Sequence, residues 1–197
     1  DLVEWRVDHF EQVSDTGQVL DAARRIADAL GGKPVLFTFR TAAEGGLQAI
    51  TPEDYAELNI AVARSGLIDL VDVELYLDRE QGDRVIAAAH EAGVKVVVSN
   101  HDFEATPPRE EIVARLRAMQ DRGADIPKIA LMPRDPGDVL TLQAATYEMA
   151  SQHADRPILT MAMAGPGVIS RMAGEVFGSC ATFAMVGQAS APGQVPV

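Results

Sequence analysis

Seven short apolar runs, rich in β-branched and aromatic residues, alternate along the chain with longer segments in which apolar residues recur every three or four positions. This alternation predicts a parallel sheet whose strands are connected by covering helices. The expected strands are Leu2 to Asp8, Pro34 to Arg40, Leu70 to Tyr76, Val94 to His101, Ile126 to Met132, Pro157 to Ala164 and Cys180 to Val186. The expected helices are Val19 to Leu30, Glu53 to Arg64, Gln81 to Ala92, Glu110 to Asp121, Asp138 to Ser151 and Val168 to Phe177.

Glycines and prolines mark the ends of the expected helices. Thr51 and Asp135 are each followed by proline, which is typical of a capping residue at a helix start. No linker or low-complexity segment interrupts the βα succession, so we expect residues 1–197 to form a single domain. Left-handed turns after helices are expected at Gly31, Gly66, Gly93, Gly123 and Gly178.

The side chains of each expected strand divide into an apolar and a polar face. In the first strand the odd positions are apolar, whereas the even positions are Glu4, Arg6 and Asp8. A strand between two helix layers is apolar on both faces, so a repeated polar face predicts an enclosed polar cavity. Ionisable residues such as Arg40 and His101 also come late in their strands, at the rim where barrel enzymes place their sites. We therefore expect a (β/α)8 barrel rather than an open sheet.

The length of the chain modifies this expectation. Its 197 residues fall short of a complete eight-stranded barrel, which typically needs ~250. The sequence begins inside an expected strand and stops in a loop that a helix should follow. We expect a single barrel domain over residues 1–197, truncated at both ends and lacking its first strand and its last helix.

Composition excludes several classes of partner. The net charge of −12 argues against a nucleic-acid or anionic-membrane surface, since either requires an extended basic patch. The single cysteine, Cys180, cannot form an internal disulfide or a cysteine-based zinc site, which fits a reducing compartment. The sequence shows neither a signal peptide nor an apolar run long enough for a membrane span. We expect a cytoplasmic protein.

Lys128 is one of only three lysines, and the other two lie at the start of expected strands. It lies inside the apolar run Ile-Pro-Lys-Ile-Ala-Leu-Met and is expected to share a strand face with Ala130 and Met132. Removing a lysine from water favours the free amine, which can attack a ketone to form an imine. Taken alone, the position is explained equally well by a lysine neutralised by a buried carboxylate such as Asp72 or Glu74.

His101 ends the expected strand that precedes the strand of Lys128. Adjacent parallel strands would place both side chains over one cavity, where an imidazole can take and return a proton. A histidine bonded to a neighbouring loop is the alternative. Glu44 follows another strand in Arg-Thr-Ala-Ala-Glu-Gly-Gly and can orient His101, or it can be a solvated loop acid.

Two loops carry weaker signals. Gly165 to Arg171 joins a strand to a helix and would direct backbone N–H groups and a guanidinium at an anion, although helix capping explains its glycines equally well. Gln188 to Gln194 is a loop of small residues that can act as a lid or be a plain surface loop.

Metal binding by Asp72, Glu74 and His101 is chemically conceivable, but two cationic groups directed into the same cavity argue against it. We expect no metal.

Seven motifs in order resemble those of type I 3-dehydroquinate dehydratases: Glu-Trp-Arg-Val-Asp, Phe-Thr-Phe-Arg, Glu-Gly-Gly, Ser-Asn-His-Asp-Phe, Pro-Lys-Ile-Ala, Gly-Val-Ile-Ser-Arg and Ser-Ala-Pro-Gly-Gln. The resemblance runs nearly end to end, and seven ordered motifs are very specific. It implies dehydration of 3-dehydroquinate to 3-dehydroshikimate, the third step of the shikimate pathway in aromatic amino-acid biosynthesis. It also implies a (β/α)8 barrel that usually forms a homodimer and needs no metal or coenzyme.

The resemblance further implies a role for each candidate residue. Lys128 would form the Schiff base, His101 would act as general acid and base, and Glu44 would be the partner carboxylate of the histidine. Arg171 would bind the substrate carboxylate. The residues placed around the ring hydroxyls and carboxylate would be Glu4, Arg6, Arg40, Ser190 and Gln194.

Two other functions use the same residues differently. A class I aldolase-like barrel would also form a lysine imine but would break a C–C bond, and it predicts phosphate-binding glycine loops after the last two strands. Only the segment from Gly165 to Gly167 qualifies as such a loop. The non-enzymatic alternative is a barrel remnant that binds shikimate-type acids without turnover.

Overall fold

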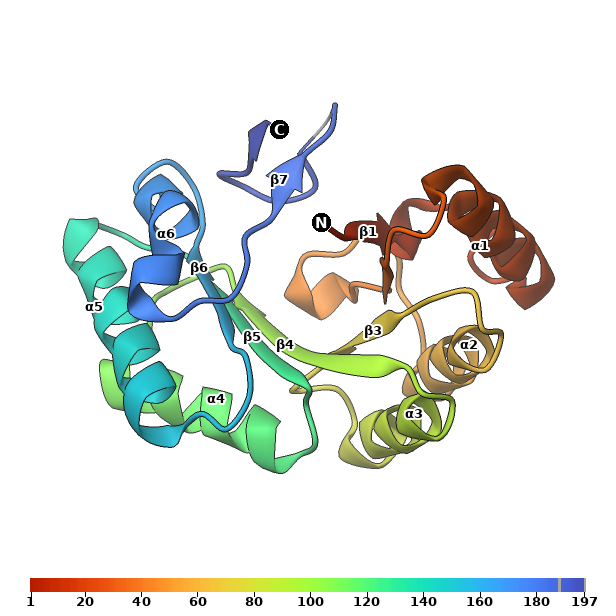
Figure 1. The fold of residues 1–197 in the computed structure, drawn as a ribbon, viewed down its shortest axis with the longest axis horizontal. Helices are drawn as coiled ribbons and strands as arrows, with labels where there is room; N and C mark the ends of the chain where they lie inside the picture. Colours follow the sequence, from red (N-terminus) through yellow and green to blue (C-terminus); the bar gives the residue numbers. More distant parts are fainter. Residues whose placement is uncertain (188, 197) are drawn as a thin grey trace. The chain divides into compact units, whose positions relative to one another are not determined.

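Parallel strands alternate with helices through the computed structural model, which describes residues 1–187 and 189–196 (Figure 1). The chain divides into two compact units, Asp1–Val98 and Ser99–Val197. Strand β4 (Lys95–Asp102) begins in the first unit and ends in the second.

In the first unit, three strands form consecutive parallel pairs: β1 (Val3–Arg6), β2 (Val35–Thr38) and β3 (Leu70–Glu74). The start of β4 continues this order, because the backbone N–H of Lys95 donates to the carbonyl of Asp69 at 2.9 Å. All four residues of β2 are buried, as expected for a strand with neighbours on both sides.

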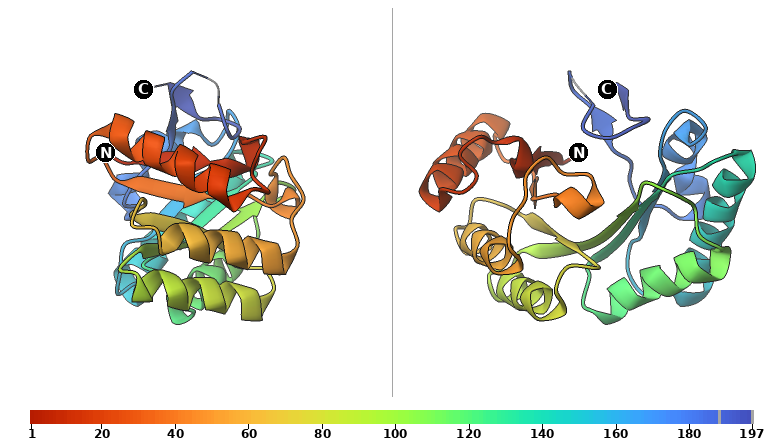
Figure 2. Two further views of the ribbon diagram at one scale, coloured as in Figure 1. Left: turned by 90° about the vertical axis from the view of Figure 1, so that its right-hand side faces the viewer. Right: turned by 180° about the vertical axis from the view of Figure 1, so that it is seen from behind.

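The helices of the first unit are α1 (Thr16–Leu30), α2 (Pro52–Ala63) and α3 (Arg79–Glu91). They lie side by side in Figure 2. Two single 3-10 turns follow strands, η1 (Val7–His9) after β1 and η2 (Ala42–Glu44) after β2. These turns carry the chain from the strand ends into the loops that hold candidate site residues.

In the second unit, β5 (Ile126–Leu131) pairs in parallel with β6 (Leu159–Ala162), and Lys128 lies opposite Leu159. The end of β4 lies on the other side of β5, since the N–H of Met132 donates to the carbonyl of Asp102 at 2.9 Å. This neighbour relation between β4 and β5 was expected from the order of the strands.

The helices of the second unit begin with α4 (Arg109–Asp121) and α5 (Pro136–Glu148), which pack on each other. The chain of α5 continues as a π-helical turn, η3 (Met149–His153). After β6 come the short helix α6 (Val168–Met172) and the 3-10 turn η4 (Gly174–Phe177). The expected helix from Val168 to Phe177 is thus divided into two pieces.

The seventh expected strand, Cys180 to Val186, is wrong over most of its length. Only β7 (Ala184–Met185) is a strand, and it pairs with β8 (Val195–Pro196) in a separate small sheet. A ladder with β6 does begin, because the N–H of Cys180 donates to the carbonyl of Ile158 at 2.8 Å. The next donor, the N–H of Thr160, bonds instead to the side-chain oxygen of Ser179 at 3.0 Å. A side chain has taken the donor that a continuing strand would need.

The expected helix caps are confirmed. The side chains of Thr51 and Asp135 accept the N–H groups of Asp54 and Asp138, and each is followed by proline in the first turn. The five glycines expected in left-handed turns all have positive φ angles. Among the helices that the structure describes, none is both long and apolar enough to cross a membrane.

Candidate active site

Arg40, just beyond the end of β2, is the centre of a buried ionic cluster in the first unit. Its guanidinium is 3% exposed and lies 2.8 Å from a carboxylate oxygen of Asp72, 2.8 Å from Glu74 and 3.6 Å from Glu44. Burial alone would lower the pKa of Arg40, but the three carboxylates outweigh it and raise the pKa. The guanidinium therefore stays charged and holds the carboxylates in fixed positions.

Glu44 is buried, so its interpretation as a solvated loop acid is wrong. The glycines that follow explain how the loop brings it inward. Gly45 has a φ of 85°, and a Cβ on Gly46 would lie 1.8 Å from the carbonyl oxygen of Arg40. Only glycine permits this close return of the chain.

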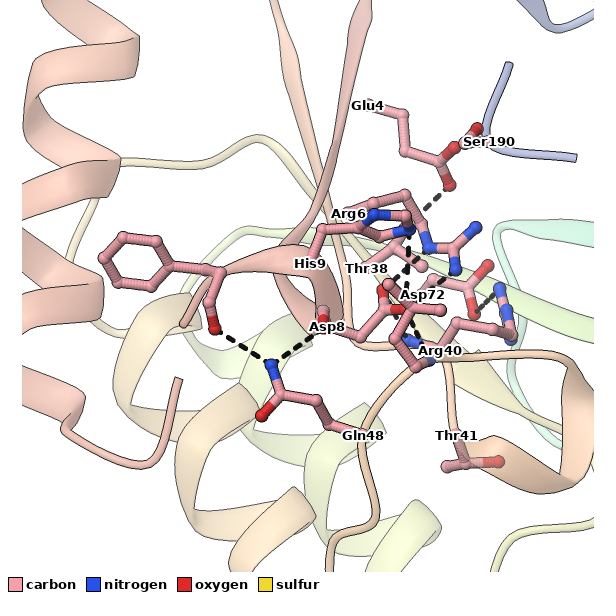
Figure 3. Close-up of polar contacts among 12 residues, drawn as sticks. Glu4, Arg6, Asp8, His9, Thr38, Arg40, Thr41, Gln48, Asp72 and Ser190 are labelled. Carbon is pink, nitrogen blue, oxygen red and sulfur yellow. Dashed lines mark hydrogen bonds and ion pairs between the residues drawn. The ribbon is translucent and has the colours of Figure 1, made fainter. Parts of the chain in front are cut away.

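The polar face of β1 extends the same group of charged residues. The hydroxyl of Thr38 donates to Glu4 at 2.9 Å, and Arg6 forms two bonds with Asp8, at 2.7 and 2.8 Å (Figure 3). Glu4 and Arg6 are thus held by neighbours within the first unit. This agrees with the sequence prediction that the even positions of this strand share a polar face.

Asp8 has a larger part in this unit than its sequence position suggested. It is fully buried, and besides Arg6 it accepts the backbone N–H groups of Leu47 at 3.2 Å and Arg40 at 3.4 Å. The amide of Gln48 donates to the carbonyls of Asp8 and Phe10, both at 2.9 Å (Figure 3). Burial would raise the pKa of Asp8, but the hydrogen bond and charge of Arg6 lower it. Asp8 joins β1 to the loop that carries Glu44.

Lys128 of β5 is buried beside an apolar cluster in the second unit. Its side chain is 4% exposed, and its Nζ atom lies 4.5 Å from the centre of the Phe183 ring. The alternation of β5 places Lys128 on the face of Ala130, which belongs to an apolar cluster with Leu159, Met161 and Met163. Ile126, Met132 and Phe183 pack against this cluster. Phe183 is a neighbour that the sequence did not single out.

His101 lies near the end of β4 and is partly exposed. The residues on either side of it, Asn100 and Asp102, both accept hydrogen bonds from Arg115 of helix α4. Side chains alternate along a strand, so His101 points away from α4. By the alternation of β5, Lys128 lies on the strand face of Ala130 and Met132, the face that packs in the apolar cluster. The expected placement of the two residues on neighbouring strands is confirmed.

Arg171 of α6 is a second buried cation in this unit, at 5% exposure. Its Nη atoms donate to the carbonyls of Phe183 at 3.4 Å and Pro192 at 3.2 Å, and Nη1 lies 3.5 Å from the Met161 sulfur. Its Nε has no hydrogen-bond partner among the described residues. Burial lowers the pKa of Arg171. Both Arg171 and Lys128 thus contact Phe183.

The loop after β7 is attached to the same region. The carbonyl of Pro192 accepts the N–H of Ala164 at 3.3 Å as well as the Arg171 bond, and a Cβ on Gly193 would lie 2.6 Å from the Ala164 carbonyl oxygen. Within the loop, the N–H of Ser190 donates to Gln194 at 2.9 Å. Gln188, which begins the expected lid, lies outside the described residues.

Each unit therefore gathers a different chemical set. The first holds the carboxylate and guanidinium groups, with Glu4, Arg6, Arg40 and Glu44 among them. The second holds Lys128, His101, Arg171, Ser190 and Gln194. No group of three or more His, Cys, Asp or Glu side chains in the described parts of the chain is arranged to hold a metal ion.

Comparisons with known proteins agree with each other over the full chain. The family model for Type I 3-dehydroquinase matches residues 1–197. Proteins named 3-dehydroquinate dehydratase from Shigella boydii serotype 4 and Escherichia coli O9:H4 are each 58% identical over 197 residues, covering 100% of this chain and 78% of the relative.

Solved structures give the same result. The type I 3-dehydroquinate dehydratase of Clostridium difficile, determined with covalently modified comenic acid, has a TM-score of 0.97 at 49% identity. The match covers 100% of this chain and 77% of the Clostridium difficile chain. The 3-dehydroquinate dehydratase of Aquifex aeolicus has a TM-score of 0.84 at 32% identity, over 100% of this chain and 83% of its own.

Proposed function

This chain belongs to the type I 3-dehydroquinase family, and from that membership we propose that it removes water from 3-dehydroquinate through an imine formed on Lys128. Its match to the solved type I enzymes confirms the predicted α/β barrel class. An enzyme of this type is a hydro-lyase, and its product is 3-dehydroshikimate. The reaction is the third step of the shikimate pathway.

The observation that carries the mechanism is the burial of Lys128 beside an apolar cluster, with its amine over the ring of Phe183. An amine withdrawn from water is a better nucleophile, because less of its hydration must be removed when it attacks. Lys128 adds to the substrate ketone, and the resulting carbinolamine loses water to give an iminium ion. The covalently modified comenic acid in the Clostridium difficile relative supports covalent chemistry in this family.

His101 then carries the proton transfers. The iminium acidifies the neighbouring C–H, His101 takes that proton, and an enamine forms. The enamine expels the β-hydroxyl, which His101 protonates as it leaves, so that the imidazole returns to its starting state. A water molecule hydrolyses the imine, releases the enone product and regenerates the Lys128 amine. The net change is the loss of one water, and the reaction needs no metal or coenzyme.

Arg171 binds the substrate carboxylate in this proposal. Its buried Nε is a donor without a partner among the described residues, which is unfavourable until an acceptor arrives. A carboxylate is the acceptor best matched to the planar guanidinium. Glu44 acts as the partner carboxylate of His101, and the remaining contacts to the ring come from Glu4, Arg6, Arg40, Ser190 and Gln194.

We further propose that residues 1–197 act as a single barrel domain, that the protein works in the cytoplasm, and that it forms a homodimer. These proposals rest on the family resemblance.

Adding 3-dehydroquinate to the protein and following the absorbance of the conjugated enone tests the activity. Turnover supports the dehydratase function, whereas binding of 3-dehydroquinate without an enone signal would indicate a binding protein without activity.

Borohydride added during turnover should reduce the imine and leave a substrate-derived mass on Lys128. Lys33→Arg is the matched control, and its Lys128 should carry the same amount of trapped adduct as that of the parent chain. An adduct on another residue, or none during turnover, would remove Lys128 from the mechanism.

A further inference from the structure

Arg115 of helix α4 binds both neighbours of His101 in strand β4. Its Nη1 donates to the side-chain oxygen of Asn100 at 3.0 Å and lies 3.4 Å from a carboxylate oxygen of Asp102. Its Nε donates to Glu111 at 3.1 Å, one helical turn away. Only 15% of the Arg115 side chain is exposed. The guanidinium is therefore fixed at one side by the helix and at the other by the strand.

The strand end that carries His101 is held on more than one side. The other carboxylate oxygen of Asp102 accepts the N–H groups of Glu104 at 3.1 Å and Ala105 at 3.0 Å. Its carbonyl accepts the N–H of Met132 at 2.9 Å, which ties β4 to β5. Asn100 is buried, and Arg115 bonds its side-chain oxygen. Nη1 of Arg115 is shared by Asn100 and Asp102, and the fixed fork of the guanidinium directs Nε to Glu111 at the same time.

From these contacts we infer that Arg115 is a positioning residue for His101, acting through Asn100 and Asp102 from the opposite face of the strand. The inference rests on the proposed role of His101. Arg115 lies on the α4 side, whereas His101 points to the other face, so the guanidinium fixes the backbone on which the imidazole is mounted. Proton transfer needs the imidazole within hydrogen-bond reach of the substrate. A displacement of about 1 Å is enough to slow such a step up to ~100-fold.

The kinetic test compares Arg115→Met with Arg117→Met, an exposed arginine on the same helix. Loss of Arg115 should lower kcat by about 10-fold or more and leave KM within about 2-fold, because the substrate contacts are unchanged. The Arg117 variant should match the parent chain. Arg115→Lys should recover part of the loss, since an ammonium keeps the charge and three donors but lacks the second nitrogen that bonds Glu111 while Nη1 bonds the strand.

Borohydride trapping separates positioning from a general loss of structure. If only proton transfer by His101 is impaired, imine formation on Lys128 continues, and the trapped fraction during turnover of Arg115→Met should equal or exceed that of the parent. Thermal unfolding should show that the variant is folded at the assay temperature. A parallel fall in kcat and in trapped adduct would overturn the inference, as would kinetics indistinguishable from those of Arg117→Met.

A measurement independent of activity distinguishes failure of this inference from failure of the proposed function. In protein labelled with ¹⁵N-histidine, the His101 imidazole signals, assigned with His101→Gln, should shift in Arg115→Met and stay unchanged in Arg117→Met. A parent chain without turnover that still shows this difference would refute the dehydratase function but not the positioning. Unchanged His101 signals in Arg115→Met would refute the positioning even in an active enzyme.

Discussion

Two buried arginines, one in each unit, have opposite electrostatic environments. Arg40 in the first unit is surrounded by the carboxylates of Asp72, Glu74 and Glu44, which raise its pKa despite burial. Arg171 in the second unit contacts a methionine sulfur and two backbone carbonyls, and burial lowers its pKa. Carboxylates neutralise Arg40, whereas no carboxylate in the described parts of the chain bonds to Arg171.

The difference separates two tasks. A compensated cation such as Arg40 fixes the geometry of the groups around it, and the interaction is already complete before any ligand binds. A cation such as Arg171, which contacts a sulfur and two carbonyls, gains more from an anionic ligand, since attraction is stronger where water is excluded. In the proposed function, the first unit therefore supplies rigid polar contacts together with Glu44, and the second supplies Lys128, His101 and Arg171.

The largest expected effect is on activity, from Lys128→Met in the second unit. Methionine has a similar length and can pack beside the apolar cluster, so the fold should persist at the assay temperature. The imine cannot form, so kcat should fall by on the order of 10⁴-fold or more. The enone assay and a thermal melt measure both quantities, with Lys33→Met as control. Retained turnover would show that Lys128 is not the nucleophile.

In the first unit the corresponding change, Arg40→Met, should lower stability in addition to removing the proposed contact of Arg40 with the substrate ring. It leaves three carboxylates buried close to each other without their shared cation, which should cost about 3–5 kcal/mol in the free energy of unfolding. Denaturant titration at neutral pH measures it. Arg24→Met removes an exposed ion pair with Asp21 and should cost less than about 1 kcal/mol. Equal effects of the two changes would mean that the buried cluster contributes no more than a surface pair.

The sequence allowed much of the framework to be predicted, because it is governed by local patterns. Period-two and helical repeats located six strands and the helices between them, and proline and glycine located the caps. The seventh strand failed for a reason that local patterns do not contain. The Ser179 hydroxyl competes for a backbone donor of Thr160, and that competition depends on the fold.

The candidate site was predictable to a similar extent. Lys128 stood out because a lysine in an apolar run is unusual, and the motif set gave the other residues. Asp8, Phe183 and Arg115 were missed as contributors, since their contacts join segments distant in sequence or reach across a helix to a strand. The burial of Glu44 also depended on Gly46, whose close approach to Arg40 cannot be read from a loop sequence alone.

His101→Ala tests whether the reactive groups of the second unit act in separate steps. Elimination should slow by about 100-fold or more, while the imine on Lys128 still forms and is trapped by borohydride. Mass spectrometry during turnover, together with the enone assay, measures both steps. His90→Ala, on helix α3 in the first unit, should behave as the parent chain does. Near-normal turnover of the His101 variant would assign the proton transfers to another group.

The smallest expected effect concerns the pH dependence of the first unit's rigid contacts. The folded-state pKa of Asp8 is lowered, so its ionised form stabilises the fold above the ordinary value of 3.8, and this contribution is lost as the pH falls through the lowered value. Asp8→Asn should therefore be less stable than the parent by about 1–3 kcal/mol at neutral pH. The difference should shrink as the solution is acidified below pH 3.8.

Denaturant titrations from neutral pH to below pH 3.8 measure this difference in the free energy of unfolding, with the exposed Asp21→Asn as control. A difference independent of pH would show that the Asp8 charge does not hold β1 to the Glu44 loop, and that shape alone does.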